Sequence, residues 1–541
     1  MGLSFTAADV LFRRGHRPGQ ELERYLDPKL AHLTAPDAMA DLEPAAERIA
    51  RAISEREPIC VFGDYDCDGI TSTAILTEVI GTLGGDVTPL LASRFAGGYG
   101  FSAPALQRVK DVGARLLVTC DCGSSDHERL EAARRAGIDA VVIDHHLVPD
   151  QPLPAVAFLN PHRPSCGFPY KGLASCGLAL FVATRLRKIL NKRLDVRRWL
   201  DLVAIGTIAD VAPLTGDNRI LVRAGLERLI DSDRLGLKAL ISSANRGRRK
   251  PMSAEDVAYQ LAPRINAPGR LTDPMVALRA LLSRDAPQAR QLAEEIEKLS
   301  ARRREIQRRI IEEATREIDE SYCDAPALVV AHADWHPGVV GIVAGRLSSQ
   351  YGKPAIVIAL EGETGRGSAR APSGFRLHDS LKRCADGLIG FGGHQAAAGL
   401  ELRADQLDAF RDAWCAVCAE QLDASPLPAE RGPDVRFDSR DDLMTVLGDV
   451  ERIEPCGAAN PGPAIWFDGV EIRQVRAIGE HAKLSLQVAG QSVSAFWPDG
   501  ANKCGASDEV RSGRVRMVGR LKRDHWRGGA TAEILVLEVQ G

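Results

Sequence analysis

An acidic turn that directly follows an apolar segment constrains the fold of this chain more than any other feature. The apolar residues 59–62 are followed by Asp64, Asp66 and Asp68, and then by a helix-like segment from 70 to about 83. This order predicts a buried strand that ends in an acidic turn before a helix. Neighbouring carboxylates repel one another, and a bound divalent cation is a usual means of cancelling that repulsion. The alternative is an aspartate-rich turn with a helix cap, because aspartate is common in turns.

Length and composition exclude few functions. The chain has 541 residues, too many for one core, so we expect about three domains. A net charge of −3 gives no support for nucleic-acid binding, although a local basic groove would suffice. The 12 cysteines are scattered singly, which favours a reducing cytoplasm over a disulfide framework. We expect neither a signal peptide nor a membrane span, because the apolar runs are short and the N-terminus lacks a basic segment followed by an apolar one.

Short apolar runs alternate with helix-length segments between 58 and about 160, which predicts a parallel sheet with helices on both faces. The runs are 59–62, 87–91, 116–119, 140–143 and 156–159. Ligands bind such sheets at the carboxyl ends of the strands. Asp121 follows the third run, and Asp144, His145 and His146 follow the fourth. Polar residues at three separate strand ends favour a metal site over unrelated turns.

Asp210 is a further candidate ligand. It lies in a largely apolar, helix-like run at 201–211, and a buried carboxylate without a partner is costly. The alternative is a solvent-facing aspartate at the helix end. Oxygen-rich sites with one or two imidazoles suit Mn²⁺ or Mg²⁺ better than zinc. A carboxylate shared between two ions would place them about 3.5–4 Å apart, a geometry used to hydrolyse phosphate esters.

The order of these motifs resembles the DHH phosphoesterase superfamily. The motifs are DYDCDG at 64–69, CDCG at 120–123, DHH at 144–146 and GTIAD at 206–210. Four further stretches resemble the RecJ family of exonucleases more closely: RFAGGYG at 94–100, NPHRPSCGFPYKGLASCG at 160–177, LAPRINAPGRL at 261–271 and GGHQAAAG at 392–399. The resemblance covers nearly the whole length and implies that two ions are held by Asp64, Asp66, Asp68, Asp121, His145 and Asp210, with His146 in the catalytic set. Whether Asp64 and His146 bind an ion, support the ligands or contact the phosphate stays open.

Residues 283–319 contain no glycine and are rich in Ala, Leu, Glu and Arg, which predicts a long helix connecting two domains. A second α/β domain is expected from about 325, with strands at 327–331 and 355–360. The segments 336–341 and 392–399 contain glycines, and each is expected to precede a helix whose N-terminus favours anions.

The resemblance identifies this second domain as a DHHA1-type substrate domain. It implies that His394 contacts the scissile or a neighbouring phosphate, and that Ser368, Arg370 and Arg94 hold the terminal phosphate. The other implied substrate contacts are Arg264, Asn266, Arg270, Gly392 and Gly393. One departure is Ala371, where the family usually has serine; this puts a hydroxyl contact in doubt but not the hydrolytic centre.

Short alternating runs between 464 and 539 predict a small β-barrel, which the resemblance makes an OB-fold. Trp497 and Trp526, with basic residues nearby, would provide stacking and charge for a single strand. The alternative for each tryptophan is a place in the barrel core.

We therefore predict an α/β protein of four parts. These are an N-terminal region with a DHH catalytic domain at 1–282, a connecting helix at 283–319, a DHHA1 domain at 320–428 and an OB-fold domain at 429–541. The resemblance implies a Mn²⁺- or Mg²⁺-dependent, monomeric exonuclease that digests single-stranded DNA from the 5′ end to 5′-mononucleotides in recombination and repair. A single-strand-binding protein and a helicase are its expected partners.

Two other functions remain open. One is a phosphodiesterase for short oligonucleotides or cyclic dinucleotides, which the long connector and the barrel argue against. The other is a non-catalytic single-strand-binding scaffold, which the complete acidic set argues against.

Overall fold

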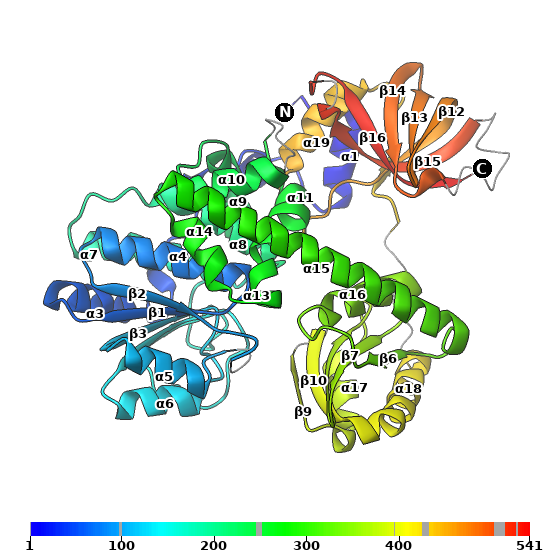
Figure 1. Ribbon diagram of the computed structural model, residues 1–541. Coiled ribbons are helices and arrows are strands. Elements are labelled where there is room, and N and C mark those ends of the chain that lie inside the picture. Colours follow the sequence, from blue (N-terminus) through cyan, green and yellow to red (C-terminus); the bar gives the residue numbers. More distant parts are fainter. Residues whose placement is uncertain are drawn as a thin grey trace. The chain divides into compact units, whose positions relative to one another are not determined.

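The structure is a computed structural model that describes residues 2–96, 100–244, 251–393, 395, 397–424, 432–501, 514–525 and 528–540 (Figure 1). It divides into two compact units. The first comprises Met1–Ala92, Tyr99–Ala262 and Arg431–Gly541, and the second comprises Ser93–Gly98 and Pro263–Glu430. Among the described residues, none of the helices combines the length and apolar character needed to cross a bilayer.

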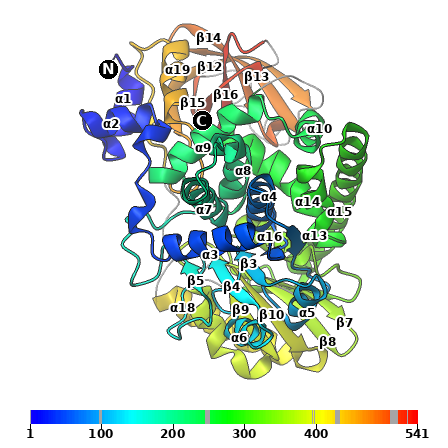
Figure 2. The same cartoon turned by 90° about the vertical axis from the view of Figure 1, so that its left-hand side faces the viewer.

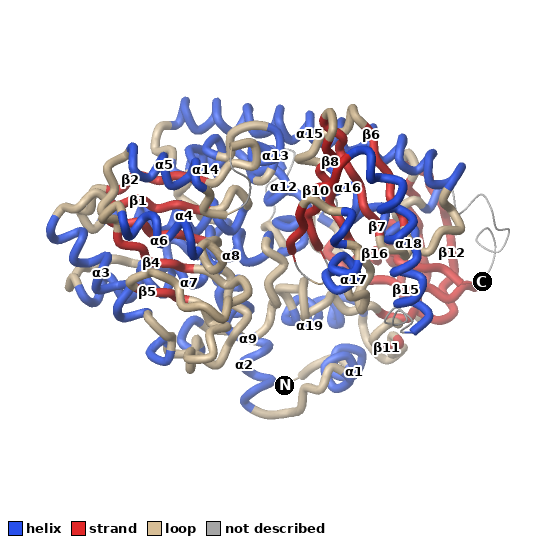
Figure 3. The backbone as a smooth tube through the Cα atoms, turned by 90° about the horizontal axis from the view of Figure 1, so that it is seen from below, coloured by secondary structure: helices blue, strands red, loops and turns tan. Residues whose placement is uncertain are grey.

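The first unit contains the predicted parallel sheet, in the strand order β2-β1-β3-β4-β5. The strands are β1 (Ile59–Gly63), β2 (Val87–Leu91), β3 (Leu116–Cys120), β4 (Asp139–Ile143) and β5 (Ala157–Leu159), and Figure 3 shows strands of this sheet side by side. In Figure 1, α3 (Leu42–Glu55), α4 (Cys67–Thr82) and α7 (Ser175–Ile189) cover one face, and α5 (Ala103–Asp111) and α6 (His127–Arg135) cover the other. The prediction of a doubly covered parallel sheet is confirmed; β1 and β3 are buried at every residue, which explains their unbroken apolar runs.

A helical layer follows the sheet in the chain. It comprises η3 (Val196–Trp199), α8 (Leu200–Ala209), α9 (Gly216–Ile230), α10 (Leu235–Ala244), α11 (Ala254–Asp256) and the π-helix η4 (Val257–Leu261). The long run around Asp210 was predicted to contain this residue within a helix. Asp210 instead directly follows α8 as its C-cap.

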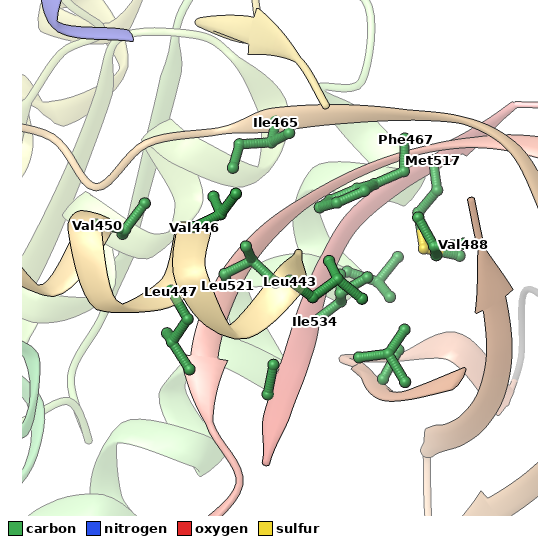
Figure 4. Packing of buried hydrophobic residues seen from close by; sticks show 14 of the residues in the cluster. Leu443, Val446, Leu447, Val450, Ile465, Phe467, Val488, Met517, Leu521 and Ile534 are labelled. Atoms are coloured by element: carbon green, nitrogen blue, oxygen red, sulfur yellow. The ribbon is translucent and has the colours of Figure 1, made fainter. Parts of the chain in front are cut away.

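The C-terminal part of the first unit is the predicted small barrel. Its strands are β11 (Val435–Arg436), β12 (Ile465–Ile478), β13 (His481–Val488), β14 (Gln491–Trp497), β15 (Arg514–Arg523) and β16 (Ala532–Gln540), and a β12–β15 pairing closes the sheet. The first part of the alternating sequence predicted between 464 and 539 forms one long strand, β12, with a register irregularity between Phe467 and Val470. Helix α19 (Leu443–Ile453) packs its apolar side chains onto the barrel core, as Figure 4 shows for Leu443, Val446 and Leu447.

The N-terminal residues complete this part of the unit. Helices α1 (Phe5–Arg13) and α2 (Gln20–Leu26) lie beside α19, although more than 400 residues separate them in the chain (Figure 2). Ser4 and Thr6 donate hydrogen bonds to the buried carboxylates of Asp449 and Asp441. Two short turns, η1 (Leu30–His32) and η2 (Pro36–Ala38), lead from α2 to α3.

Helix α12 (Ala262–Ile265) begins at the last residue of the first unit and continues into the second. It is followed by α13 (Ala267–Leu271), α14 (Met275–Leu282) and the 36-residue helix α15 (Ala286–Ser321). A five-stranded sheet follows, in the order β6-β7-β8-β10-β9. Its strands are β6 (Leu328–His332), β7 (Ala355–Glu361), β8 (Thr364–Arg370), β9 (Gly390–Gly393) and β10 (Ala397–Arg403), and its helices include α16 (Val340–Tyr351), α17 (Leu377–Arg383) and α18 (Leu407–Ala424).

One expectation for this unit is wrong. The glycine-containing segment 392–399 does not precede a helix, because β9 and β10 pair as antiparallel strands. The segment 336–341 does lead into a helix, α16, as predicted.

Candidate metal centre and phosphate-binding groups

The register of the parallel sheet places three aspartates side by side. Gly63 pairs with Cys120, and Cys120 pairs with Ile143, so the residues that follow these strand ends are neighbours. The ladder continues for one further step: Asp64 N donates to Cys120 O (3.1 Å), and Asp121 N donates to Ile143 O (3.0 Å). The carboxyl edge of the sheet therefore brings Asp64, Asp121 and Asp144 together, as the rule for parallel sheets predicts.

Two helix N-termini hold the aspartates of the first turn. Asp66 caps α4, since its Oδ1 accepts hydrogen bonds from Asp68 N (3.0 Å) and Gly69 N (3.2 Å). The Asp68 carboxylate accepts hydrogen bonds from Ser175 N (2.7 Å) and Cys176 N (3.0 Å), the first residues of α7. An anion is stabilised at a helix N-terminus, so Asp68 is fixed in position although it is 1% exposed.

His145 lies at the centre of the acidic groups. Its Nε2 atom lies 3.2 Å from Asp121 Oδ1, 3.6 Å from Asp210 Oδ2 and 3.9 Å from Asp68 Oδ2. This atom is buried and makes no hydrogen bond of good geometry to the described residues. A buried imidazole nitrogen that faces carboxylates in this way is suited to binding a cation that the carboxylates share.

Three sets of side chains in the described part of the chain could each hold a metal ion, with ligand atoms within 4.8 Å of one another. They are Asp64, Asp66 and Asp121; Asp68, His145 and Asp210; and Asp121, His145 and His146. Asp121 and His145 are each shared by two sets, which suits adjacent ions bridged by common ligands. The structure thus brings together every predicted ligand.

The electrostatics of the cluster fit a cation. Burial, followed by the nearby carboxylates, raises the pKa of Asp121 well above its ordinary value, and burial also raises the pKa of Asp68. Burial and the charges of Asp68 and Asp66 raise the pKa of Asp210 to about 9. These carboxylates are costly to ionise together, and a divalent ion would remove that cost. The donor set of carboxylate oxygens and imidazole nitrogens is that of Mn²⁺ or Mg²⁺.

Asp144 is a supporting residue that the sequence interpretation did not assign. Its carboxylate lies 2.7 Å from His146 Nδ1 and accepts hydrogen bonds from Ser124 N and His145 N. Burial would lower the pKa of His146, but the hydrogen bond and charge of Asp144 outweigh it and raise that pKa to about 9. Burial alone would raise the pKa of the Asp144 carboxyl. The hydrogen bond and charge of His146 outweigh burial and hold that pKa well below its ordinary value. The signal in the sequence was the first letter of the DHH motif itself.

A separate group of basic side chains lies in the second unit. A Cβ atom at Gly341, in the first turn of α16, would lie 3.1 Å from Ser368 Oγ and 3.4 Å from Arg370 Nη2. Burial, followed by the charge of Arg94, lowers the pKa of the Arg370 guanidinium, and the same two causes lower the pKa of His336. Guanidinium groups close to a helix N-terminus form a positively charged site that can bind a phosphate group. The structure therefore brings together Arg94, Ser368 and Arg370, and their role in holding a phosphate stays a prediction.

The remaining predicted substrate contacts are more scattered. Arg264 forms an ion pair with Glu297 on α15 (2.7 Å), Arg270 donates to Gly338 O (3.2 Å), and Asn266 Oδ1 is buried without a hydrogen-bond partner among the described residues. Gly392 and Gly393 are exposed on β9; a Cβ atom would meet open space at Gly392, but the Ala397 carbonyl at 2.4 Å from Gly393. Only Gly393 is therefore required by local packing. His394 lies outside the described residues.

The predicted stacking role of Trp497 is wrong. Its side chain is 5% exposed and belongs to the barrel core, so it presents no face to a base. Alternation along β14 places Trp497 on the inward face, so its role is the alternative one, a place in the barrel core. Trp526 lies outside the described residues.

Comparison with known proteins agrees with this geometry. The chain matches three domain families in order: the DHH family, N-terminal domain (residues 58–207), the DHHA1 domain (residues 324–420) and the RecJ OB domain (residues 434–538). It is 35% identical to the single-stranded-DNA-specific exonuclease RecJ of Escherichia coli, over 97% of this chain and 93% of that protein. It is 34% identical to the same enzyme of Bacillus subtilis, over 98% of this chain and 67% of that protein.

Solved structures lead to the same family. The RecJ of Thermus thermophilus in complex with Mn²⁺ superimposes with a TM-score of 0.82 at 29% identity, over 99% of this chain and 76% of that chain. The complex of the same protein with Mg²⁺ gives a TM-score of 0.77 at 28% identity, over 99% of this chain and 74% of that chain.

Proposed function

Because the chain belongs to the RecJ family of single-stranded-DNA-specific exonucleases, we propose that it is a metal-dependent exonuclease that degrades single-stranded DNA. The observation that carries the proposal is the set of overlapping ligand groups in which Asp121 and His145 are each shared. A site for adjacent divalent ions suits hydrolysis of a phosphodiester.

The residues of the first unit would act as follows. Asp64, Asp66, Asp68, Asp121, His145 and Asp210 would hold two Mn²⁺ or Mg²⁺ ions, with His146 completing the catalytic set. When bound, the ions lower the pKa of the attacking water and neutralise charge on the phosphate. The α7 amides hold Asp68 in place, and Asp144 fixes the ring of His146 through Nδ1.

The residues of the second unit would recognise the end of the strand. Arg94, Ser368 and Arg370 would hold a terminal 5′-phosphate, and His394 would contact a phosphate nearer the cleaved bond. Arg264, Asn266, Arg270, Gly392 and Gly393 would line the path of the strand. A terminal phosphate bound in this way suits digestion from 5′ to 3′ with release of 5′-mononucleotides.

The wider setting follows the family. We propose a division of labour among residues 1–282 (catalysis), 283–319 (connection), 320–428 (substrate end) and 429–541 (strand binding). The enzyme would act as a monomer in the cytoplasm, in recombination and repair, beside a single-strand-binding protein and a helicase.

The test is a cleavage assay with Mn²⁺ or with EDTA, on three substrates: a 5′-phosphorylated single strand, a duplex and a cyclic dinucleotide. We expect only the single strand to be degraded, only with Mn²⁺. Asp68→Ala should abolish cleavage and leave strand binding largely intact, and Asp68→Asn, which can still accept an α7 amide, controls for folding. Unchanged cleavage by both variants would refute the metal assignment. Preferred cleavage of the dinucleotide, or binding without cleavage, would favour the other two functions.

A further inference from the structure

Helix α8 ends in an arrangement that normally requires glycine. Val211 N donates to Ile208 O (3.2 Å), and Ala212 N donates to Thr207 O (3.2 Å), which is the hydrogen-bond pattern of a Schellman cap. Its third element is a residue in the left-handed conformation just after the cap residue, here Val211 with φ +58°. For a β-branched side chain this conformation is a strained outlier.

The same unit shows what this position usually holds. Helices α4, α5 and α6 end in the same pair of hydrogen bonds, with Gly84, Gly113 and Gly137 at the left-handed position, and α3 ends in this pair with the unbranched Arg56 there at φ +56°. Helix α7 ends with Asn191 there, at φ +49°, and asparagine tolerates this conformation. Among the ends of these six helices, Val211 is therefore the β-branched residue, the side-chain type that tolerates the left-handed conformation least.

Packing of the Val211 side chain does not compensate for the free-energy cost of this backbone conformation, because Val211 is 72% exposed. The segment behind it is nevertheless fixed. Tyr170 donates to Pro213 O (2.9 Å), and Leu214 N donates to Ala458 O (2.8 Å). An apolar side chain is thus held in solvent by a rigid support, and strain of this kind is kept where it serves a function.

The neighbour of Val211 indicates that function. The preceding residue, Asp210, lies with Oδ2 3.6 Å from His145 Nε2 in the candidate metal centre. Resting on the proposed function, we propose that Val211 packs against the base of the terminal nucleotide, which cleavage at that centre releases. An isopropyl group forms no hydrogen bond with a base edge, so it contacts any base alike, as a nuclease without sequence preference requires.

The experiment separates strain from function in the full-length protein. Val211→Gly should raise the Tm, because glycine adopts the left-handed conformation freely. The same variant should lower kcat/KM on a 5′-phosphorylated single strand about ten-fold, the effect of losing one valine-sized apolar contact. Val211→Asn, which also tolerates the conformation, should lose the same activity. Asn191→Gly is the matched control and should leave kcat/KM unchanged.

The base contact is tested by the substrate. On a strand whose terminal nucleotide is abasic, wild type and Val211→Gly should be equally fast, because the contact is absent from both. An equal loss on normal and abasic strands, or wild-type kcat/KM in Val211→Gly, would overturn the contact while leaving the proposed function standing. A wild-type chain that leaves all single strands intact would overturn both.

Discussion

Asp144 shows how a residue outside the candidate ligand sets can organise a site. Its carboxylate accepts hydrogen bonds from Ser124 N (3.0 Å) and His145 N (2.8 Å), and it lies 2.7 Å from His146 Nδ1. These contacts fix the turn after β4 and the orientation of one imidazole. Partners of this kind raise the basicity of a ligand and reduce its freedom, so they affect metal binding as strongly as some ligands do.

We therefore expect Asp144→Asn to weaken Mn²⁺ binding about 10–100-fold. An asparagine amide has one acceptor oxygen, and its NH₂ group would face donors such as Ser124 N and His146 Nδ1, so it cannot accept all of the hydrogen bonds that the carboxylate accepts. Calorimetric titration with Mn²⁺ measures the change, and circular dichroism checks that the chain remains folded. The control is Asp139→Asn on β4, which removes an ion pair with Arg48 of α3 but no contact at the site. Wild-type affinity in Asp144→Asn would show that His146 is oriented by other means.

Close packing of two helices positions Asp68. Gly206 on α8 faces α4, and a Cβ atom there would lie 2.4 Å from Thr71 Oγ1, 2.6 Å from Cys176 Sγ and 2.8 Å from Asp68 Oδ1. The absence of a side chain lets the two helices approach at the level of the metal centre. The glycine of the GTIAD motif is thus explained by a contact between elements rather than by its own backbone conformation.

Gly206→Ala should lower the free energy of unfolding by about 1–3 kcal/mol, since the added methyl group must displace its neighbours. It should also reduce Mn²⁺ affinity, because one of those neighbours is Asp68. Gly81→Ala on α4 is the matched control: its Cβ would meet only Val87 Cγ1 at 3.8 Å, so stability should stay equal or rise. Urea unfolding and Mn²⁺ titration of both variants measure the two effects. An equal free energy of unfolding and an equal Mn²⁺ affinity in Gly206→Ala and Gly81→Ala would contradict the packing argument.

At the scale of the molecule, Arg219 connects three distant segments of the first unit. This residue is 2% exposed, and its guanidinium donates to Tyr25 O (2.9 Å), Ile453 O (2.7 Å) and Arg452 O (2.9 Å). It also lies 4.0 Å from the centre of the Tyr25 ring. Helix α9 is thereby joined to α2 at the N-terminus and to the end of α19 beside the barrel.

Arg219→Lys should destabilise the protein by about 1–3 kcal/mol, because a single ammonium group cannot reach all of these carbonyls and leaves buried acceptors unsatisfied. Thermal and urea unfolding measure the loss. Arg223→Lys, one turn later on α9, is the control, since its ion pair with Glu227 is partly exposed and is worth little. If both lysine variants unfold like wild type, Arg219 does not hold the segments together.

Much of this architecture follows from local patterns in the sequence. The five strands of the parallel sheet coincide with the predicted apolar runs to within one residue at either end, because strands buried on both faces must be apolar throughout. Alternation predicts the barrel strands, and the absence of glycine across 283–319 predicts the long helix, which the structure places at Ala286–Ser321. The candidate ligands were recognised because carboxylates and imidazoles follow strand ends, where a parallel sheet binds its ligands.

What only the tertiary structure decided depends on contacts between distant residues. The α7 amides that hold Asp68 lie 107 and 108 residues further along the chain, and the partners of Arg219 lie up to 236 residues away. Local patterns could not tell that the glycines at 392 and 393 belong to a hairpin, or that Trp497 faces the core. The reason is physical: local preferences select a helix or a strand, but strand order, register and burial are set by the free energy of packing the whole chain.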